Sequence, residues 1–133
     1  MQARPRTPRS LEVPGVTHGT APIPMGARVG NVIYSSGILG KDAANDQLPA
    51  DAESQARHVF ENMRTLLKQG GARPDDVVRM TVYLKDDSIR SALNKEWLAA
   101  FPDPHDRPAR HVLIHPLPGA MLIQIEIVAV ITS

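Results

Sequence analysis

The amino-acid sequence predicts an α+β fold in which two helices cover one face of a single sheet. Two segments with a helical spacing of apolar residues alternate with strand-like segments. The chain ends in two strand-like segments around a turn that contains Pro116, Pro118 and Gly119. The predicted order is β-β-α-β-α-β-β, and such helices bury their apolar stripes against a sheet of about four to six strands.

The first helix is predicted between Asp51 and Gly70. Asp51 is a suitable N-cap, and Gly70 with Gly71 ends the helix. Between them, apolar residues recur at spacings of three and four, which predicts one buried stripe made of Ala56, Val59, Phe60, Met63, Leu66 and Leu67.

A second helix is predicted from Asp87 or Ser88, either of which can cap it, to the residues before Pro102. Its apolar stripe contains Ile89, Leu93, Trp97 and Ala100. The strands are predicted over residues 75–84, 109–115 and 122–131, with a hairpin or bent strand over residues 28–36.

The last strand has one wholly apolar face and one mixed face that carries Gln124 and Glu126. A carboxylate on a half-buried strand needs a partner, and Arg110 on the preceding strand is the expected one. The sheet face away from the helices is predicted to be too apolar for water, which favours a closed oligomer. Its expected members are Val77, Thr81, Tyr83, Val112, Ile114, Val128 and Val130.

The charge is unevenly distributed along the chain. The net charge is +1, but three of the 15 basic residues lie in the first ten positions with no acidic residue, which leaves 12 basic and 14 acidic residues in the remainder. This balance argues against a nucleic-acid-binding surface. We expect a flexible basic tail over residues 1–12 and a single folded domain over residues 13–133.

The absence of cysteine excludes disulfides, zinc–thiolate sites and thiol catalysis. The histidines do not indicate a metal site, because His111 and His115 lie about 13 Å apart on one strand face and His18 and His58 are isolated. No apolar run approaches roughly 18 residues, and the N-terminus lacks the apolar core of a signal peptide. We expect a cytoplasmic protein without membrane contacts.

Several stretches resemble the RidA/YjgF family of reactive-intermediate deaminases, also known as endoribonuclease L-PSP-like proteins. They are RVGNVIYSSG (28–37), ADAESQARHVFENMRTLLKQGGA (50–72), VVRMTVYLKD (77–86), LNKEWLAAF (93–101), RPAR (107–110) and IQIEIVAV (123–130). The combination of RPAR with the closing strand is the most specific signal. The resemblance implies a chorismate-mutase-like α+β fold, a homotrimer with active sites between subunits, and no cofactor or metal.

The resemblance also implies a reaction, the hydrolysis of reactive enamines and imines to 2-oxo acids and ammonia by a 2-iminobutanoate/2-iminopropanoate deaminase-like enzyme. Arg110 is then expected to bind the carboxylate of a 2-imino acid, and Glu126 to place the attacking water. A guanidinium can grip a carboxylate through two parallel hydrogen bonds, and a carboxylate can accept a proton from water. The residues expected to line the pocket are Ser36, Gly37, Asn94 and Val112.

Two positions depart from the family pattern. Many members have Gly-Pro-Tyr where this chain has Ala21-Pro22-Ile23, and glutamine where it has Ile38. Without the tyrosine hydroxyl and the glutamine amide, the pocket is expected to be more apolar, with Ile23 and Ile38 as its walls. This predicts a preference for imines with larger apolar side chains.

The sequence leaves other interpretations open. Arg110 and Glu126 could form a structural ion pair at a subunit interface. The protein could be a specialised deaminase of an aminomuconate-like catabolic intermediate, or a non-enzymatic, chaperone-like trimer that binds a small carboxylate. A ribonuclease role has little support, because the body of the chain is near neutral and lacks a His–His or His–Lys acid–base pair.

Overall fold

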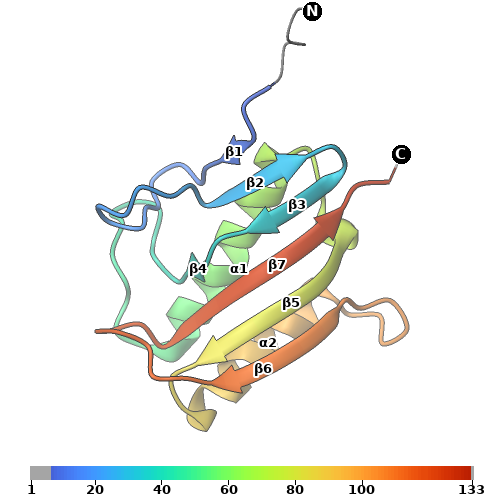
Figure 1. Cartoon of the computed structure of the whole chain (residues 1–133). Coiled ribbons are helices and arrows are strands. Elements are labelled where there is room, and N and C mark those ends of the chain that lie inside the picture. The colour runs from blue at the N-terminus through green and yellow to red at the C-terminus, as the bar shows by residue number, and fades with distance from the viewer. Residues whose placement is uncertain (1–6, 133) are drawn as a thin grey trace, which may run out of the picture.

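The computed structural model describes residues 7–132, which form one sheet with two helices on one face (Figure 1). The strands are β1 (Ser10–Leu11), β2 (Gly26–Val29), β3 (Val32–Ser35), β4 (Ile38–Leu39), β5 (Val77–Leu84), β6 (Ala109–Ile114) and β7 (Ile123–Val130). The helices are α1 (Ala52–Gln69) and α2 (Arg90–Ala100). The 3-10 turn η1 (Pro74–Asp76) leads into β5, and η2 (Asp87–Ile89) leads into α2. The strand order is β1-β2-β3-β7-β5-β6, and β4 also pairs with β7. The predicted α+β fold is confirmed.

Helix α1 forms where the sequence predicts it. The side chain of Asp51 accepts a hydrogen bond from the N–H of Ser54, and Gly70 ends the helix with its N–H bonded to the carbonyl of Leu66. The predicted apolar stripe is buried against the sheet. Neither α1 nor any other helix within the described residues combines the length and apolarity needed to cross a membrane.

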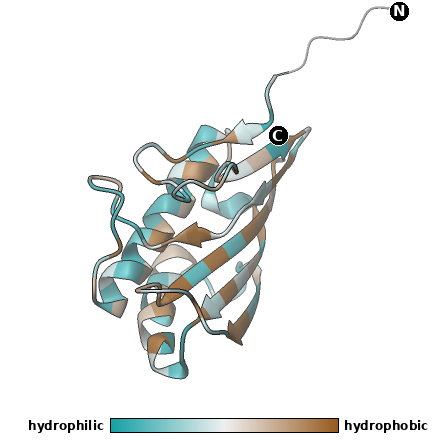
Figure 2. Ribbon diagram, turned by 60° about the vertical axis from the view of Figure 1, so that its left-hand side comes forward, coloured by the Kyte–Doolittle hydropathy of each residue, from teal (hydrophilic) through white to brown (hydrophobic). Residues whose placement is uncertain are grey.

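Strand β7 lies in the middle of the sheet and pairs antiparallel with β3, β4 and β5. Alternate side chains of β7, from Ile123 to Ala129, are buried beneath the helices, whereas Gln124, Glu126 and Val128 point to the other side. Figure 2 shows this alternation as bands of opposite hydropathy along the strands. We call the side away from the helices the open face.

The open face differs from the prediction at three residues. Val77, Val112 and Ile114 pair with residues of the helix side, so they also face the helices. A β-bulge between Val77 and Arg79 shifts the alternation of β5. In β6 both faces carry apolar residues, so the sequence pattern alone cannot show which face of β6 lies beneath the helices. The remaining predicted members lie on the open face: Thr81, Tyr83, Val128 and Val130.

The N-terminal segment joins the sheet earlier than predicted. Ser10 and Leu11 form β1 and pair with β2, and the N–H of Arg28 donates to the carbonyl of Arg9 at 2.8 Å. The partly buried Leu11 packs against the core, which favours this short edge strand. The predicted tail over residues 1–12 is therefore too long, and its first six residues lie outside the described part of the chain.

The fully buried Gln55 of α1 ties two loops to the helix. Its Nε2 donates to the carbonyls of Pro49 and Ala120, both at 2.8 Å, and its Oε1 accepts from the N–H of Leu122 at 2.9 Å. Because Gln55→Leu leaves these groups unpaired, we expect the free energy of unfolding to fall by about 3 kcal/mol. Urea unfolding at one fixed protein concentration measures the change. Gln69→Leu at the exposed end of α1 is the control, and an equal loss there contradicts the role of Gln55.

Candidate functional site

Arg110 lies on β6, an edge strand of the sheet, and its side chain reaches α2. Its Nη1 donates to Oδ1 of Asn94 at 2.8 Å, and its guanidinium carbon lies 4.9 Å from the ring centre of Trp97. Asn94 and Trp97 are three residues apart on α2 and therefore share one side of the helix. Together they fix the position and the plane of the guanidinium. Val112 lies on the same side of β6.

The charge of Arg110 is not balanced by any carboxylate among the residues that the structure describes. Burial lowers the pKa of Arg110 below its ordinary value, and the positive charge of Arg90 lowers it further. No ion pair formed among residues 7–132 involves Arg110. A half-buried cation without a counter-ion is unfavourable, and a bound anion offsets that cost. The geometry suits the carboxylate of a ligand.

Glu126 lies on the open face of β7, opposite Thr81 of β5. The carboxylate raises the pKa of Tyr83 above its ordinary value, first through a hydrogen bond with the phenol and second through its negative charge. Arg110 pairs with Met80 of β5, whereas Glu126 pairs with Thr81. Neighbouring side chains of a strand point to opposite faces, so Arg110 and Glu126 lie on opposite faces of the sheet. The expectation that these two residues pair within one chain is wrong, because β5 lies between their strands.

Ser36 and Gly37 link β3 to β4. The hydroxyl of Ser36 donates to the carbonyl of Pro24 at 2.8 Å, and the carbonyl of Gly37 accepts from Nε2 of His18 at 2.7 Å. A Cβ atom at Gly37 would lie 2.5 Å from Nε2 of Gln124, so a larger residue there would force the side chain of Gln124 to move. Because Gln124 shares the open face of β7 with Glu126, the link runs beside the part of the sheet that carries Glu126.

The two isoleucines that depart from the family pattern lie in different surroundings. Ile23 is 50% exposed and lines a cavity of about 380 Å³ together with His18. Ile38 is fully buried in β4 and pairs with Ile125 on the helix side. The expectation that Ile38 is a wall of the pocket is therefore wrong, because its pairing with β7 turns it into the core.

The predicted site residues form two separate groups in one chain. The arginine group, on α2 and β6, consists of Arg110, Asn94 and Val112. The glutamate group, on β7 and the segments beside it, consists of Glu126, Ser36, Gly37 and Ile23. The first group can bind an anion, and the second contains a carboxylate that can accept a proton.

Two contacts at these groups have no counterpart in the sequence pattern. The spacing of α2 assigns Trp97 to the core, and it is buried, but its ring also supports Arg110. His18 has no neighbouring partner in the sequence, yet it bonds to Gly37, 19 residues away. A backbone carbonyl carries no side-chain signature, so no motif could have revealed this bond.

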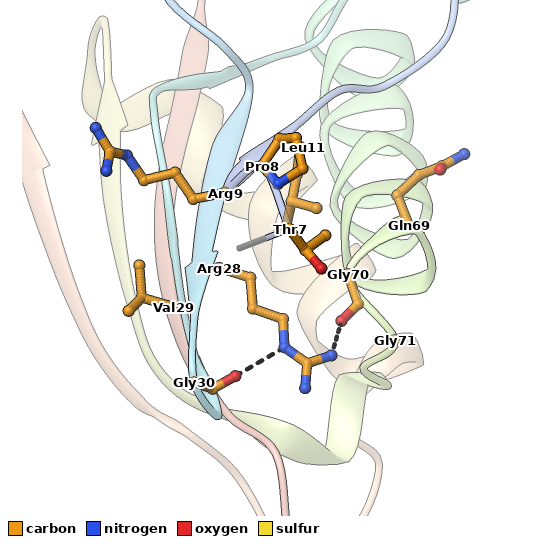
Figure 3. A pocket seen from close by; sticks show the side chains of 10 residues that line it. All are labelled: Thr7, Pro8, Arg9, Leu11, Arg28, Val29, Gly30, Gln69, Gly70 and Gly71. Atoms are coloured by element: carbon orange, nitrogen blue, oxygen red, sulfur yellow. Dashed lines mark hydrogen bonds between the residues drawn. The ribbon is translucent and has the colours of Figure 1, made fainter. Parts of the chain in front are cut away.

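A larger cavity, of about 610 Å³, lies between β1, the β2–β3 turn and the end of α1 (Figure 3). Arg28 borders it, and its Nε donates to the carbonyl of Gly30 at 2.9 Å and its Nη1 to that of Gly70 at 2.7 Å. The bond to Gly70 holds β2 to the C-terminus of α1, and the bond to Gly30 stays within the β2–β3 turn. None of the predicted site residues lines this cavity. Within residues 7–132, no group of three or more His, Asp or Glu side chains is placed to hold a metal ion.

Known sequences match almost the whole chain. The profile of the family described as Endoribonuclease L-PSP matches residues 20–131. A RutC family protein of Pyrococcus abyssi is 34% identical over 116 residues, covering 82% of this chain and 90% of that protein. The 2-iminobutanoate/2-iminopropanoate deaminase of Escherichia coli is 32% identical over 111 residues, with coverages of 82% and 87%. The 3-aminoacrylate deaminase RutC of Acinetobacter baylyi is 33% identical over 106 residues, with coverages of 78% and 82%.

Solved structures share the fold. RidA from an Antarctic Psychrobacter species superposes with a TM-score of 0.82 at 31% identity, covering 95% of this chain and 100% of that one. The YjgF gene product of Escherichia coli superposes with a TM-score of 0.81 at 27% identity, with coverages of 92% and 98%. The family match over residues 20–131 and the sequence identities above 30% agree with the observed order of strands and helices. The chain therefore belongs to the RidA/YjgF family.

Proposed function

We propose that the protein hydrolyses 2-imino acids and their enamine tautomers to 2-oxo acids and ammonia. The observation that carries the proposal is the half-buried guanidinium of Arg110, oriented by Asn94 and Trp97 and not neutralised by any carboxylate of the described residues. Relatives named as 2-iminobutanoate/2-iminopropanoate deaminase and 3-aminoacrylate deaminase match 82% and 78% of the chain, which supports this reaction.

In the proposed reaction, Arg110 binds the carboxylate of the imino acid through two parallel hydrogen bonds and fixes its plane. Water attacks the carbon of the C=N bond, and the π electrons move to nitrogen. Glu126 accepts a proton from the water and returns it to nitrogen. The hydroxyl of this adduct then gives its proton to the nitrogen, by way of Glu126, as the C–N bond breaks and the C=O bond forms. One imino acid and one water thus give one 2-oxo acid and one ammonia.

We also propose that the site forms between copies of the chain in a homotrimer. Because Arg110 and Glu126 lie on opposite faces of one sheet, a small imino acid cannot contact both in a single chain. A second copy would cover the large apolar side chains that the open face exposes, and the family resemblance favours three copies. These side chains are Val32, Tyr34, Leu113 and Val130.

Arg110→Lys tests the carboxylate clamp. Lysine keeps the charge but lacks the planar fork, so we expect kcat/KM to fall by roughly 10²-fold or more with an unchanged oligomer mass. The measurement is ammonia release from imines generated in situ by an amino-acid oxidase. Arg64→Lys on the exposed side of α1 is the control. A loss of less than about threefold for Arg110→Lys contradicts the clamp, since a bidentate contact should contribute more than that.

A mixture of two inactive variants tests the site between copies. Glu126→Gln keeps the size of the side chain but cannot accept the proton, so it should be inactive like Arg110→Lys. When the two variants are refolded together, some sites combine an intact Arg110 from one chain with an intact Glu126 from another. Random assembly should restore about a quarter of the wild-type activity. If the mixture stays inactive although mass measurement shows mixed oligomers, both residues act within one chain.

Ile23→Tyr tests the side-chain preference. The isoleucine presents an apolar wall, so the wild-type protein should favour imines derived from leucine or methionine over those derived from serine or threonine. The tyrosine should move kcat/KM toward the smaller polar imines by roughly 10-fold. Arg64→Tyr, on the exposed side of α1, is the control. An unchanged substrate profile in Ile23→Tyr means that residue 23 does not contact the substrate.

A further inference from the structure

His18 lies outside the predicted site but contacts one of its residues, Gly37, directly. Its Nε2 lies 2.7 Å from the carbonyl oxygen of Gly37, and the ring is half-buried. Because a carbonyl only accepts, Nε2 carries the proton in this bond, whether the ring is neutral or charged. One side chain therefore connects the segment before β2 with the link between β3 and β4.

The backbone next to His18 is firmly anchored. The N–H and hydroxyl of Thr17 donate to the two carboxylate oxygens of Asp46, at 3.0 and 2.7 Å. The carbonyl of Thr17 accepts from Nζ of Lys41 at 2.8 Å, and Lys41 and Asp46 form an ion pair at 3.3 Å. The hydrogen bonds from Thr17 lower the pKa of Asp46, so the carboxylate is ionised at neutral pH. This anchor limits the positions that the imidazole of His18 can take.

Gly37 is confined from the other side by β7. The space where a Cβ would stand is occupied by the side chain of Gln124, at 2.5 Å. Ile38 on the far side of the peptide is held in β4, but glycine without a Cβ restricts its own backbone less than other residues do. The bond from His18 supplies a contact on the carbonyl, and the packing of Gln124 supplies one on the Cα.

His18 also borders the cavity of about 380 Å³ that Ile23 lines. The base of this cavity is apolar and buried, with Val13, Val16 and Met25 each less than 5% exposed. The ring therefore lies between this cavity and Gly37.

We propose that His18 is a positioning residue of the deaminase site, which fixes the Gly37–Ile38 peptide plane through its hydrogen bond to the Gly37 carbonyl. The proposal rests on the proposed function, because Gly37 belongs to the glutamate group beside which the imino acid would bind. His18 itself transfers no proton in this scheme. The required property is a donor N–H at the position of Nε2, so a side-chain amide of similar reach should replace it.

The test compares His18→Leu with His18→Gln, and uses His105→Leu in the exposed 102–108 loop as the control. We expect His18→Leu to lower kcat/KM for the best imine by roughly 10-fold or more, and His18→Gln to keep it within about threefold. Oligomer mass and Tm are measured on the same samples, and activity is measured well below Tm. Turnover of His18→Leu within about twofold of wild type overturns the proposal, and so does an equal loss in His18→Gln.

A second measurement does not depend on activity. Gly37–Ile38 is the only Gly-Ile dipeptide in the sequence, so a carbonyl-13C glycine and amide-15N isoleucine label gives one NMR signal for this peptide. The signal should shift in His18→Leu, shift less in His18→Gln and stay unchanged in His105→Leu. An unshifted signal in His18→Leu overturns the proposal. If the wild-type protein turns over no imine of the panel, the proposed function fails first, and the positioning role fails with it.

Discussion

The rest of the structure depends on the difference between the two faces of β7, one apolar and buried and the other carrying polar side chains. This strand pairs with β3, β4 and β5, so its backbone is fixed on both edges, and one of its faces must be apolar because α1 and α2 cover it. Ile123, Ile125 and Ile127 satisfy this requirement and are almost completely buried. The same register places Glu126 on the opposite face, where a carboxylate can remain solvated.

This register also explains why Arg110 and Glu126 do not lie together within one chain. The neighbouring strand β5 carries Met80 toward the helices and Thr81 toward the open face, and β6 follows its register in parallel. Arg110 therefore points to α2, where Asn94 and Trp97 hold it. Any substrate that needs both Arg110 and Glu126 must bind where the helix side of one chain meets the open face of another, as in the proposed homotrimer.

Buried polar side chains hold the loops around this framework. Asn62 of α1 is 3% exposed, and its Nδ2 donates to the carbonyls of Leu39 at 2.9 Å and Lys41 at 3.0 Å. Lys41 in turn bonds to the carbonyl of Thr17, next to His18. A chain of hydrogen bonds thus runs from the interior of α1 to the segment that contacts Gly37. Loops held in this way can keep the geometry of a site although they lack regular structure.

The sequence by itself determined the two helices, the long strands and the buried faces of α1 and β7. The helical spacing of α1, its cap at Asp51 and the alternation of β7 are local patterns, and each is read directly from neighbouring residues. The resemblance of RPAR and the closing strand indicated Arg110 and Glu126 as site residues for the same reason, because each motif is contiguous.

Only the tertiary structure decided how these elements face one another. The bulge near Val78 and the two apolar faces of β6 left the orientation of Val112 undetermined, and the pairing with β5 settled it. The same pairing separated Arg110 from Glu126. The burial of Ile38 and the bond between His18 and Gly37 depend on contacts between segments distant in the sequence. Such contacts follow from register and packing, and no local pattern of side chains encodes them.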